Sequence, residues 1–79
     1  MNPSEIEALV RAAFPDATCQ LVDLTGTQNH YELTVVSSSF VGQSSLERHR
    51  RVYTALGATV GTRIHALALK TLTPDQTGQ

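Results

Sequence analysis

Residues 37–65 constrain the fold of this chain most. They contain an extended segment, a glycine turn and a basic amphipathic helix, and a short apolar strand begins at Ile64. A connection that carries a helix brings the chain back to the edge of the sheet where it started, so the strands on either side should be parallel. The sequence therefore predicts a βαβ-like unit in which two strand starts, near His30 and at His65, share one edge of a sheet.

An apolar face at helical spacing predicts a first helix near Ser4. Ser4 and Glu7 have the spacing of a capping box, in which side chains satisfy free backbone amides of the first turn. Pro15 disfavours helical conformation in the residue before it, so the helix is expected to end there. The apolar residues recur at the i, i+3, i+4, i+7 and i+8 positions of one face. They are Ile6, Leu9, Val10, Ala13 and Phe14.

Two strands joined by a hairpin loop are expected next. β-Branched and apolar residues from position 18 to about 25 indicate the first strand, and residues 25–29 have the composition of a turn. The alternation over residues 31–36 is that of a strand with one buried face, on which the first helix should pack. That face consists of Tyr31, Leu33 and Val35.

A second helix is predicted to begin near Ser45. Ser44 and Glu47 form a second capping box ahead of it. Two glycines punctuate the region that follows, so the helix is expected to end at Gly57, with at most one further turn before Gly61.

The second helix is expected to bury an apolar stripe and to expose two arginines. Arg48 and Arg51 should project from the opposite side, where Glu47 and Arg51 have the spacing of an ion pair worth ~0.3 kcal/mol. His49 lies on the stripe and is interpreted as a structural histidine. The stripe consists of Leu46, His49, Tyr53 and Leu56, with Val52 beside it.

The chain is expected to fold as one α+β domain over residues 1–79. A chain of 79 residues buries roughly 60% of its unfolded surface, which is enough for one three-stranded mixed sheet with helices packed on one face. The third strand is predicted over residues 64–71. Residues 72–79 are expected to form a C-terminal tail with one helical turn that starts near Pro74.

The composition predicts neither a membrane span nor a signal peptide. Apolar runs are only a few residues long, and residues 1–7 carry two acids and no basic apolar leader. Cys19 is the only cysteine in the sequence, which fits a reducing compartment, and it is expected to pack in the core. A cytoplasmic location is therefore expected.

Charge is distributed unevenly along the chain. Residues 1–43 carry five acids and one arginine, a net charge of −4, whereas residues 44–71 carry five basic residues and one acid, a net charge of +4. Such asymmetry can steer an acidic partner or a nucleic acid to one face. The needs of solubility alone also account for it, and charge alone favours this second explanation.

Several motifs, in order and at the right spacing, resemble the BolA family. They are Ser37-Ser38-Ser39-Phe40-Val41-Gly42-Gln43-Ser44, Arg48-His49-Arg50 with Val52-Tyr53 and Leu56, Ile64-His65-Ala66-Leu67, and Lys70-Thr71-Leu72-Thr73-Pro74. The resemblance covers nearly the whole chain, and the short hairpin loop is similar to that of short-loop bacterial members. It implies a fold similar to the class II KH domain with the element order αββααβ, which agrees with the order predicted from the residues.

The resemblance also implies a partner and a cofactor. BolA proteins pair with monothiol glutaredoxins, and a [2Fe-2S] cluster is bridged between a glutaredoxin cysteine with glutathione and ligands of the BolA protein, for iron-sulfur trafficking or iron-related regulation. His65 matches the family's histidine ligand. The second, variable ligand comes from the hairpin loop, where His30 is the candidate, although it also matches a histidine that precedes the strand aromatic in long-loop members. Alone, the chain is expected to hold no cluster and to be a monomer or a weak homodimer.

Nucleic-acid binding is the alternative function, as a KH-like transcriptional regulator that uses the basic helix at residues 44–57. A KH domain grips the nucleic-acid backbone with a GXXG loop, but Gly57 and Gly61 are separated by three residues. The net charge of −1 is also unlike that of a dedicated binder. The sequence has no motif of a known catalytic site, so an enzyme is not expected. The candidate contacts are Arg48, Arg50, Arg51, Arg63 and Lys70.

Overall fold

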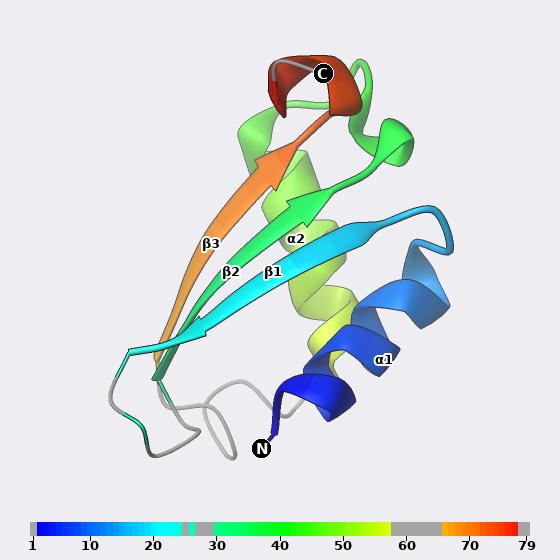
Figure 1. Ribbon diagram of the computed structural model, residues 1–79. Coiled ribbons are helices and arrows are strands. Elements are labelled where there is room, and N and C mark those ends of the chain that lie inside the picture. The colour runs from blue at the N-terminus through cyan, green and yellow to red at the C-terminus, as the bar shows by residue number, and fades with distance from the viewer. Residues whose placement is uncertain (1, 25, 27–29, 58–65, 78–79) are drawn as a thin grey trace.

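A three-stranded sheet carries two α-helices on one of its faces (Figure 1). The computed structural model describes residues 2–24, 26, 30–57 and 66–77. Within them, the elements in chain order are α1 (Pro3–Ala13), β1 (Thr18–Asp23), β2 (His30–Val36), the 3-10 turn η1 (Ser38–Phe40), α2 (Ser45–Leu56), β3 (Ala66–Leu72) and the 3-10 turn η3 (Pro74–Thr77).

The sheet is mixed and has the strand order β1-β2-β3. β1 runs antiparallel to β2, and β3 runs parallel to β2. The predicted parallel return after the second helix is therefore confirmed. A backbone hydrogen bond from Ser37 N to the Leu72 carbonyl oxygen, 3.0 Å long, continues the parallel pairing past the end of β2. The further turn expected before Gly61 and the strand start at Ile64 lie outside the described residues.

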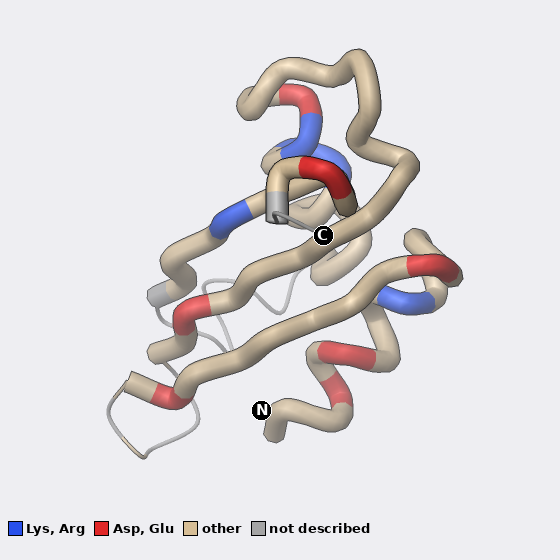
Figure 2. The backbone as a smooth tube through the Cα atoms, turned by 45° about the horizontal axis from the view of Figure 1, so that its top comes forward, with Lys and Arg blue, Asp and Glu red and all other residues tan. Residues whose placement is uncertain are grey.

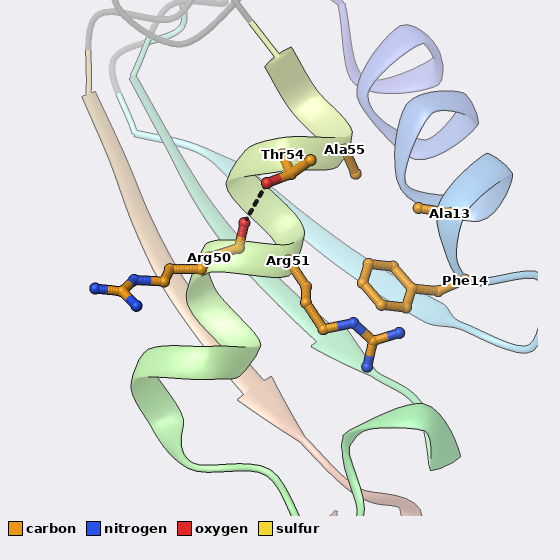
Figure 3. Close-up of a pocket in the computed structure, with 6 residues that line it drawn as sticks. All are labelled: Ala13, Phe14, Arg50, Arg51, Thr54 and Ala55. Atoms are coloured by element: carbon orange, nitrogen blue, oxygen red, sulfur yellow. Dashed lines mark hydrogen bonds between the residues drawn. The ribbon is translucent and has the colours of Figure 1, made fainter.

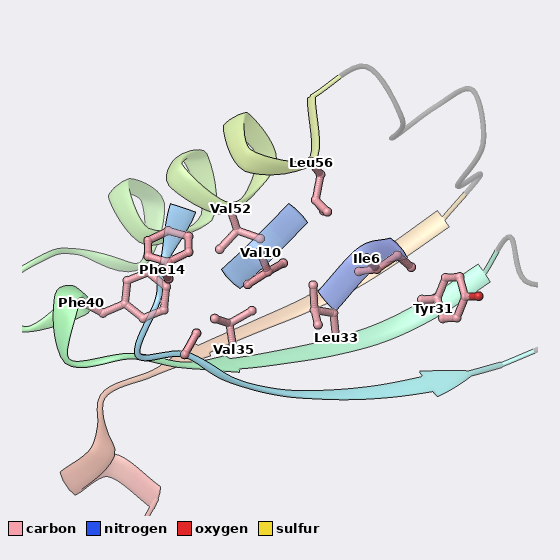
Figure 4. Close-up of a cluster of buried hydrophobic side chains, with 10 residues drawn as sticks. Ile6, Val10, Phe14, Tyr31, Leu33, Val35, Phe40, Val52 and Leu56 are labelled. Atoms are coloured by element: carbon pink, nitrogen blue, oxygen red, sulfur yellow. The ribbon is translucent and has the colours of Figure 1, made fainter. Parts of the chain in front are cut away.

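The core lies between the central strand and the two helices (Figure 4). The predicted alternation of β2 is confirmed, because Tyr31, Leu33 and Val35 are fully buried on the helix side. Burying a side chain of this kind contributes roughly 1.5–3 kcal/mol relative to leaving it exposed. The remaining core residues are Ile6, Val10, Phe14, Ala17, Phe40, Val52 and Leu56.

Helix α1 begins earlier than the sequence pattern predicts. Its N-cap is Asn2, whose Oδ1 accepts a hydrogen bond from Glu5 N at 3.0 Å, and Pro3 is the first helical residue. Asparagine caps helices as well as serine does, and proline at the first helical position has its φ angle already set. The capping box at Ser4 and Glu7 was therefore the wrong choice of start. The predicted end before Pro15 is confirmed.

Both predicted ends of α2 are confirmed. Ser44 Oγ accepts a hydrogen bond from Glu47 N at 3.2 Å and lies 3.2 Å from Glu47 Oε1. Gly57 follows the last helical residue at φ 62° and ψ −143°, a combination that side-chain-bearing residues rarely adopt.

The predicted buried stripe of α2 is only partly right. Val52 and Leu56 are buried, whereas Leu46 is 60% exposed and Tyr53 is 39% exposed. The face that meets the rest of the protein follows the row through positions 48, 52 and 56, which places an arginine, Arg48, on the inner side of the helix.

The segment expected to be a tail is tied to the rest of the fold. Leu72 belongs to β3, and the predicted turn near Pro74 is the 3-10 turn η3. Thr73 is buried, and its N–H donates to Gln76 Oε1 at 2.8 Å. None of the helices in the described part of the chain is long and apolar enough to span a membrane.

Candidate functional site

The starts of the two parallel strands lie side by side (Figure 1). His30 opens β2 and is paired in register with Ala66, which opens β3. His65, the first predicted ligand, lies outside the described residues, but it is the residue directly before Ala66 in the chain. The topology thus confirms that the start of the third strand returns to the edge at which His30 lies.

His30 is a half-buried residue at the hairpin end of the sheet. Its carbonyl oxygen accepts a hydrogen bond from Leu24 N at 2.8 Å, which closes the hairpin next to it, and its ring Nδ1 is buried. Side chains alternate along a strand, so His30 belongs to the sheet face of Glu32 and Thr34, opposite the helices. Among the described residues, no three His, Cys, Asp or Glu side chains gather closely enough to hold a metal ion.

Cys19 lies on a different part of the sheet. It is paired with Val35, five residues beyond His30 along β2, which corresponds to roughly 16 Å. The thiol is half-buried against the core, as predicted for this cysteine. Burial raises its pKa, and the charge of Glu7 adds to this effect while that of Arg11 opposes it. Cys19 is therefore a neutral packing residue near neutral pH.

Arg48, a predicted nucleic-acid contact, binds neighbouring groups of the protein. Its Nε donates to the Gln43 carbonyl oxygen at 2.9 Å, and its Nη1 donates to Gln76 Oε1 at 2.9 Å. The same Nη1 lies 3.5 Å from the Thr71 carbonyl oxygen, and the guanidinium carbon is 5.9 Å from the centre of the Phe40 ring. Arg48 thus joins the loop before α2 to the end of β3 and to η3.

Arg51 has a similar structural role. Its Nη1 donates to the Ser39 carbonyl oxygen at 2.9 Å and to Gln43 Oε1 at 2.8 Å. Its guanidinium carbon lies 4.8 Å from the centre of the Phe14 ring and 5.9 Å from that of Phe40. The expectation that Arg48 and Arg51 project outward, with Arg51 paired to Glu47, was wrong.

The exposed basic surface is accordingly smaller than the predicted one. Arg50 and Lys70 are exposed, and Arg63 lies outside the described residues. Figure 2 shows that most basic positions lie on α2 and β3, while the acidic positions lie mainly on α1 and along β1 and β2. The charge asymmetry of the sequence therefore persists in the folded protein.

The carboxylate of Asp16, which the sequence did not single out, binds the serine run at residues 37–39. Asp16 Oδ1 accepts from Ser37 Oγ at 2.8 Å, and Asp16 Oδ2 accepts from Ser38 N at 2.9 Å and from Ser38 Oγ at 2.7 Å. These hydrogen bonds, those from Ser38 first, lower the pKa of Asp16 to about 2. The contact links the turn after α1 to the entrance of η1. Asp16 and Ser37 are 21 residues apart, so no local sequence pattern predicts this contact.

Comparisons with known proteins agree with this fold and these motifs. The family model described as "BolA-like protein" matches residues 7–76. The "DNA-binding transcriptional regulator BolA" of Escherichia coli is 37% identical over 92% of this chain and 76% of that protein.

Solved structures are similar over the whole domain. A BolA homologue from Coxiella burnetii is 34% identical, with a TM-score of 0.77 over 100% of this chain and 99% of that one. BolA1 from Arabidopsis thaliana is 25% identical, with a TM-score of 0.83 over 92% of each chain. The motifs, the mixed sheet with its parallel return and these matches lead to one conclusion: the chain belongs to the BolA family.

Proposed function

We propose that this protein is a non-enzymatic partner of a monothiol glutaredoxin in the cytoplasm. In this proposal His65 and His30 are its ligands to a [2Fe-2S] cluster shared with the glutaredoxin and glutathione, for iron-sulfur trafficking or iron-related regulation. Membership of the BolA family supports the class of partner. The pairing of His30 with Ala66 is the observation that carries the choice of residues.

The pairing of His30 with Ala66 bears on His65 because His65 directly precedes Ala66 in the chain. One peptide unit, ~3.8 Å between Cα atoms, separates His65 from the residue that pairs with His30. The buried Nδ1 of His30 favours Nε2 as its metal-binding atom. Two imidazoles are too few to complete a cluster, so the remaining ligands must come from the partner.

The donor type fits iron. Neutral imidazole binds iron well, and histidine in place of thiolate on one iron of a [2Fe-2S] cluster raises the reduction potential. A ligating histidine also needs an acceptor for its other ring nitrogen, which fixes the tautomer and the ring orientation.

Visible circular dichroism tests the proposal. The protein would be mixed with a monothiol glutaredoxin, iron, sulfide and glutathione, and the spectrum compared with that of the glutaredoxin alone. We expect a changed spectrum that His65→Ala abolishes and His30→Ala alters. His49→Ala, on the half-buried part of α2, is the matched histidine control and should leave the change intact. A change that persists in His65→Ala would refute the ligand assignment.

Nucleic-acid binding is the second candidate, because the E. coli relative is named a DNA-binding transcriptional regulator. In this chain the exposed cations Arg50 and Lys70 are its best contacts. Arg48 and Arg51 are poor test positions, because their guanidinium groups bind backbone carbonyls and their loss would perturb the fold.

The test of this second candidate is a salt series of DNA-binding measurements. Counterion release makes affinity fall steeply as salt rises. Replacing both Arg50 and Lys70 by glutamine should weaken binding and reduce the slope of log K against log salt by about 2. Equal slopes for the variant and the natural protein would rule out these two residues as the contacts.

A further inference from the structure

A hollow lies between the end of α1 and the second half of α2 (Figure 3). It has a volume of about 300 Å³, at the lower end of the range for ligand pockets. None of its lining residues is acidic. They are Ala13, Phe14, Arg50, Arg51, Thr54 and Ala55.

Arg51 presents a fixed, partly used guanidinium to this hollow. Both hydrogens of Nη1 are engaged, one by Ser39 and one by Gln43, and the group lies over the Phe14 ring. Within the described residues, Nε and Nη2 donate no hydrogen bond, and Arg51 forms no ion pair. A guanidinium that packing already holds in place loses little conformational freedom when it binds an anion, and its planar fork matches a carboxylate.

The rest of the lining is small and apolar. Ala13 and Ala55 contribute methyl groups, and Thr54 Oγ1 donates to the Arg50 carbonyl oxygen at 2.8 Å, so its hydroxyl is already satisfied. Figure 3 shows the Arg50 side chain pointing away from Phe14, on the other side of α2. The hollow therefore offers one cation beside an apolar wall.

We propose that this hollow docks an acidic segment of a partner protein, with a carboxylate on Arg51 and a neighbouring apolar side chain against Ala13 and Ala55. A single available cation suits one carboxylate, whereas nucleic-acid backbones are bound through several phosphate contacts. The α2 wall of the hollow carries three arginines and one acid, a net charge of +2, which favours an acidic partner.

An NMR titration of the full chain tests this docking site. The probe is an acetylated, amidated tripeptide of glutamate between two leucines, and the control peptide carries glutamine in place of glutamate. We expect saturable shifts of the amides of Arg51, Thr54 and Ala55 with the glutamate peptide, and binding at least about tenfold weaker with the glutamine peptide. Equal binding of the two peptides, or shifts confined to other residues, would overturn the proposal.

Two matched variants locate the binding site. Ala13→Leu fills the hollow and should weaken binding about tenfold or more, whereas Ala12→Leu adds the same group at an exposed neighbour that does not line it and should bind as the natural protein does. Far-UV circular dichroism checks that both variants fold. Undiminished binding by Ala13→Leu refutes the site.

Butyrate serves as a third probe, because it carries the same carboxylate without a peptide. Butyrate that binds as tightly as the glutamate peptide would make this a small-carboxylate site and refute the protein partner. The histidine variants of the cluster experiment leave this site intact, so failure of one proposal does not entail failure of the other.

Discussion

Replacing Arg51 by alanine should destabilise the protein far more than the same change at Arg50. Arg51 makes two hydrogen bonds from a charged group in a partly exposed setting, each worth about 0.5–1 kcal/mol. Its guanidinium over the Phe14 ring adds about 0.5–1 kcal/mol. Arg51→Ala should therefore lower the free energy of unfolding by about 1.5–3 kcal/mol.

Arg50→Ala is the matched control. The Arg50 side chain is exposed, and the hydrogen bond that this residue accepts from Thr54 goes to its backbone carbonyl, which the substitution keeps. The expected loss is about 0.5 kcal/mol or less. The total stability of a chain of 79 residues is roughly 4–12 kcal/mol, so the difference between the two variants is a substantial fraction of it.

Urea unfolding followed by far-UV circular dichroism measures both variants. With a slope of about 1 kcal/mol per molar urea, the Arg51→Ala midpoint should fall by roughly 1.5–3 M, and the Arg50→Ala midpoint by about 0.5 M or less. Unchanged slopes would indicate that the shifts in midpoint report changes in stability. Midpoints that agree to within about 0.5 M would refute the structural role assigned to Arg51.

Three further predictions follow from the fold. Leu33→Ala, in the centre of the sheet, should lower the free energy of unfolding in urea by about 2.7–5 kcal/mol. Leu24→Ala, at a side chain that is 56% exposed, should lower it by less than about 1 kcal/mol. Similar losses for the two variants would contradict the core described above. In Gly57→Ala the added Cβ meets no atom within 4 Å, but the backbone lies in a region that glycine alone adopts readily. The substitution should therefore cost about 1–3 kcal/mol. A neutral effect in thermal unfolding would contradict that geometry. Asp16 has a lowered pKa in the folded state, so the stability it contributes is fully present above its ordinary pKa of 3.8 and is lost as pH falls through that value to about 2. Asp16→Asn should therefore flatten the fall in urea midpoint over this pH range, and an identical pH profile for the variant would argue against the contact with the serine run.

The ends of α2 and the direction of β3 could be predicted because their causes are local or topological. Ser44 and Gly57 act on the backbone within a few residues, and the parallel return of the chain follows from a helical connection between strands. The start of α1 was predicted incorrectly although its cause is also local. Asn2 and Ser4 both have good capping side chains, and Pro3 at the first helical position favours the earlier start.

The buried face of α2 was predicted incorrectly because hydrophobicity alone does not determine which side chains pack inward. Arg48 and Arg51 lie inward since Phe14 and Phe40 offer aromatic surfaces and the neighbouring loop offers carbonyl oxygens. These partners come from distant parts of the sequence. The helical spacing of Leu46 and Tyr53 carries no information about these partners, and neither residue is buried.

The sheet edge that carries the candidate ligands could be predicted from the sequence as far as topology determines it. The return of the third strand to the edge at His30 follows from the helical connection, and the register of His30 with Ala66 bears it out. The hollow at Arg51 could not be predicted from the sequence, because it depends on how α1 and α2 pack and on the directions in which the side chains of Arg50 and Arg51 point.

The parallel pairing of β2 with β3 has a consequence for synthesis on the ribosome. β2 has its antiparallel neighbour as soon as it is made, but the 36 residues from Ser37 to Leu72 must still be added before its other neighbour is complete. At about 5–20 residues per second, this takes roughly 2–7 s. During that interval the central strand, which carries the core residues Tyr31, Leu33 and Val35, has an open edge, and open strand edges promote aggregation. Chaperone demand during translation should therefore depend on how quickly β3 is delivered.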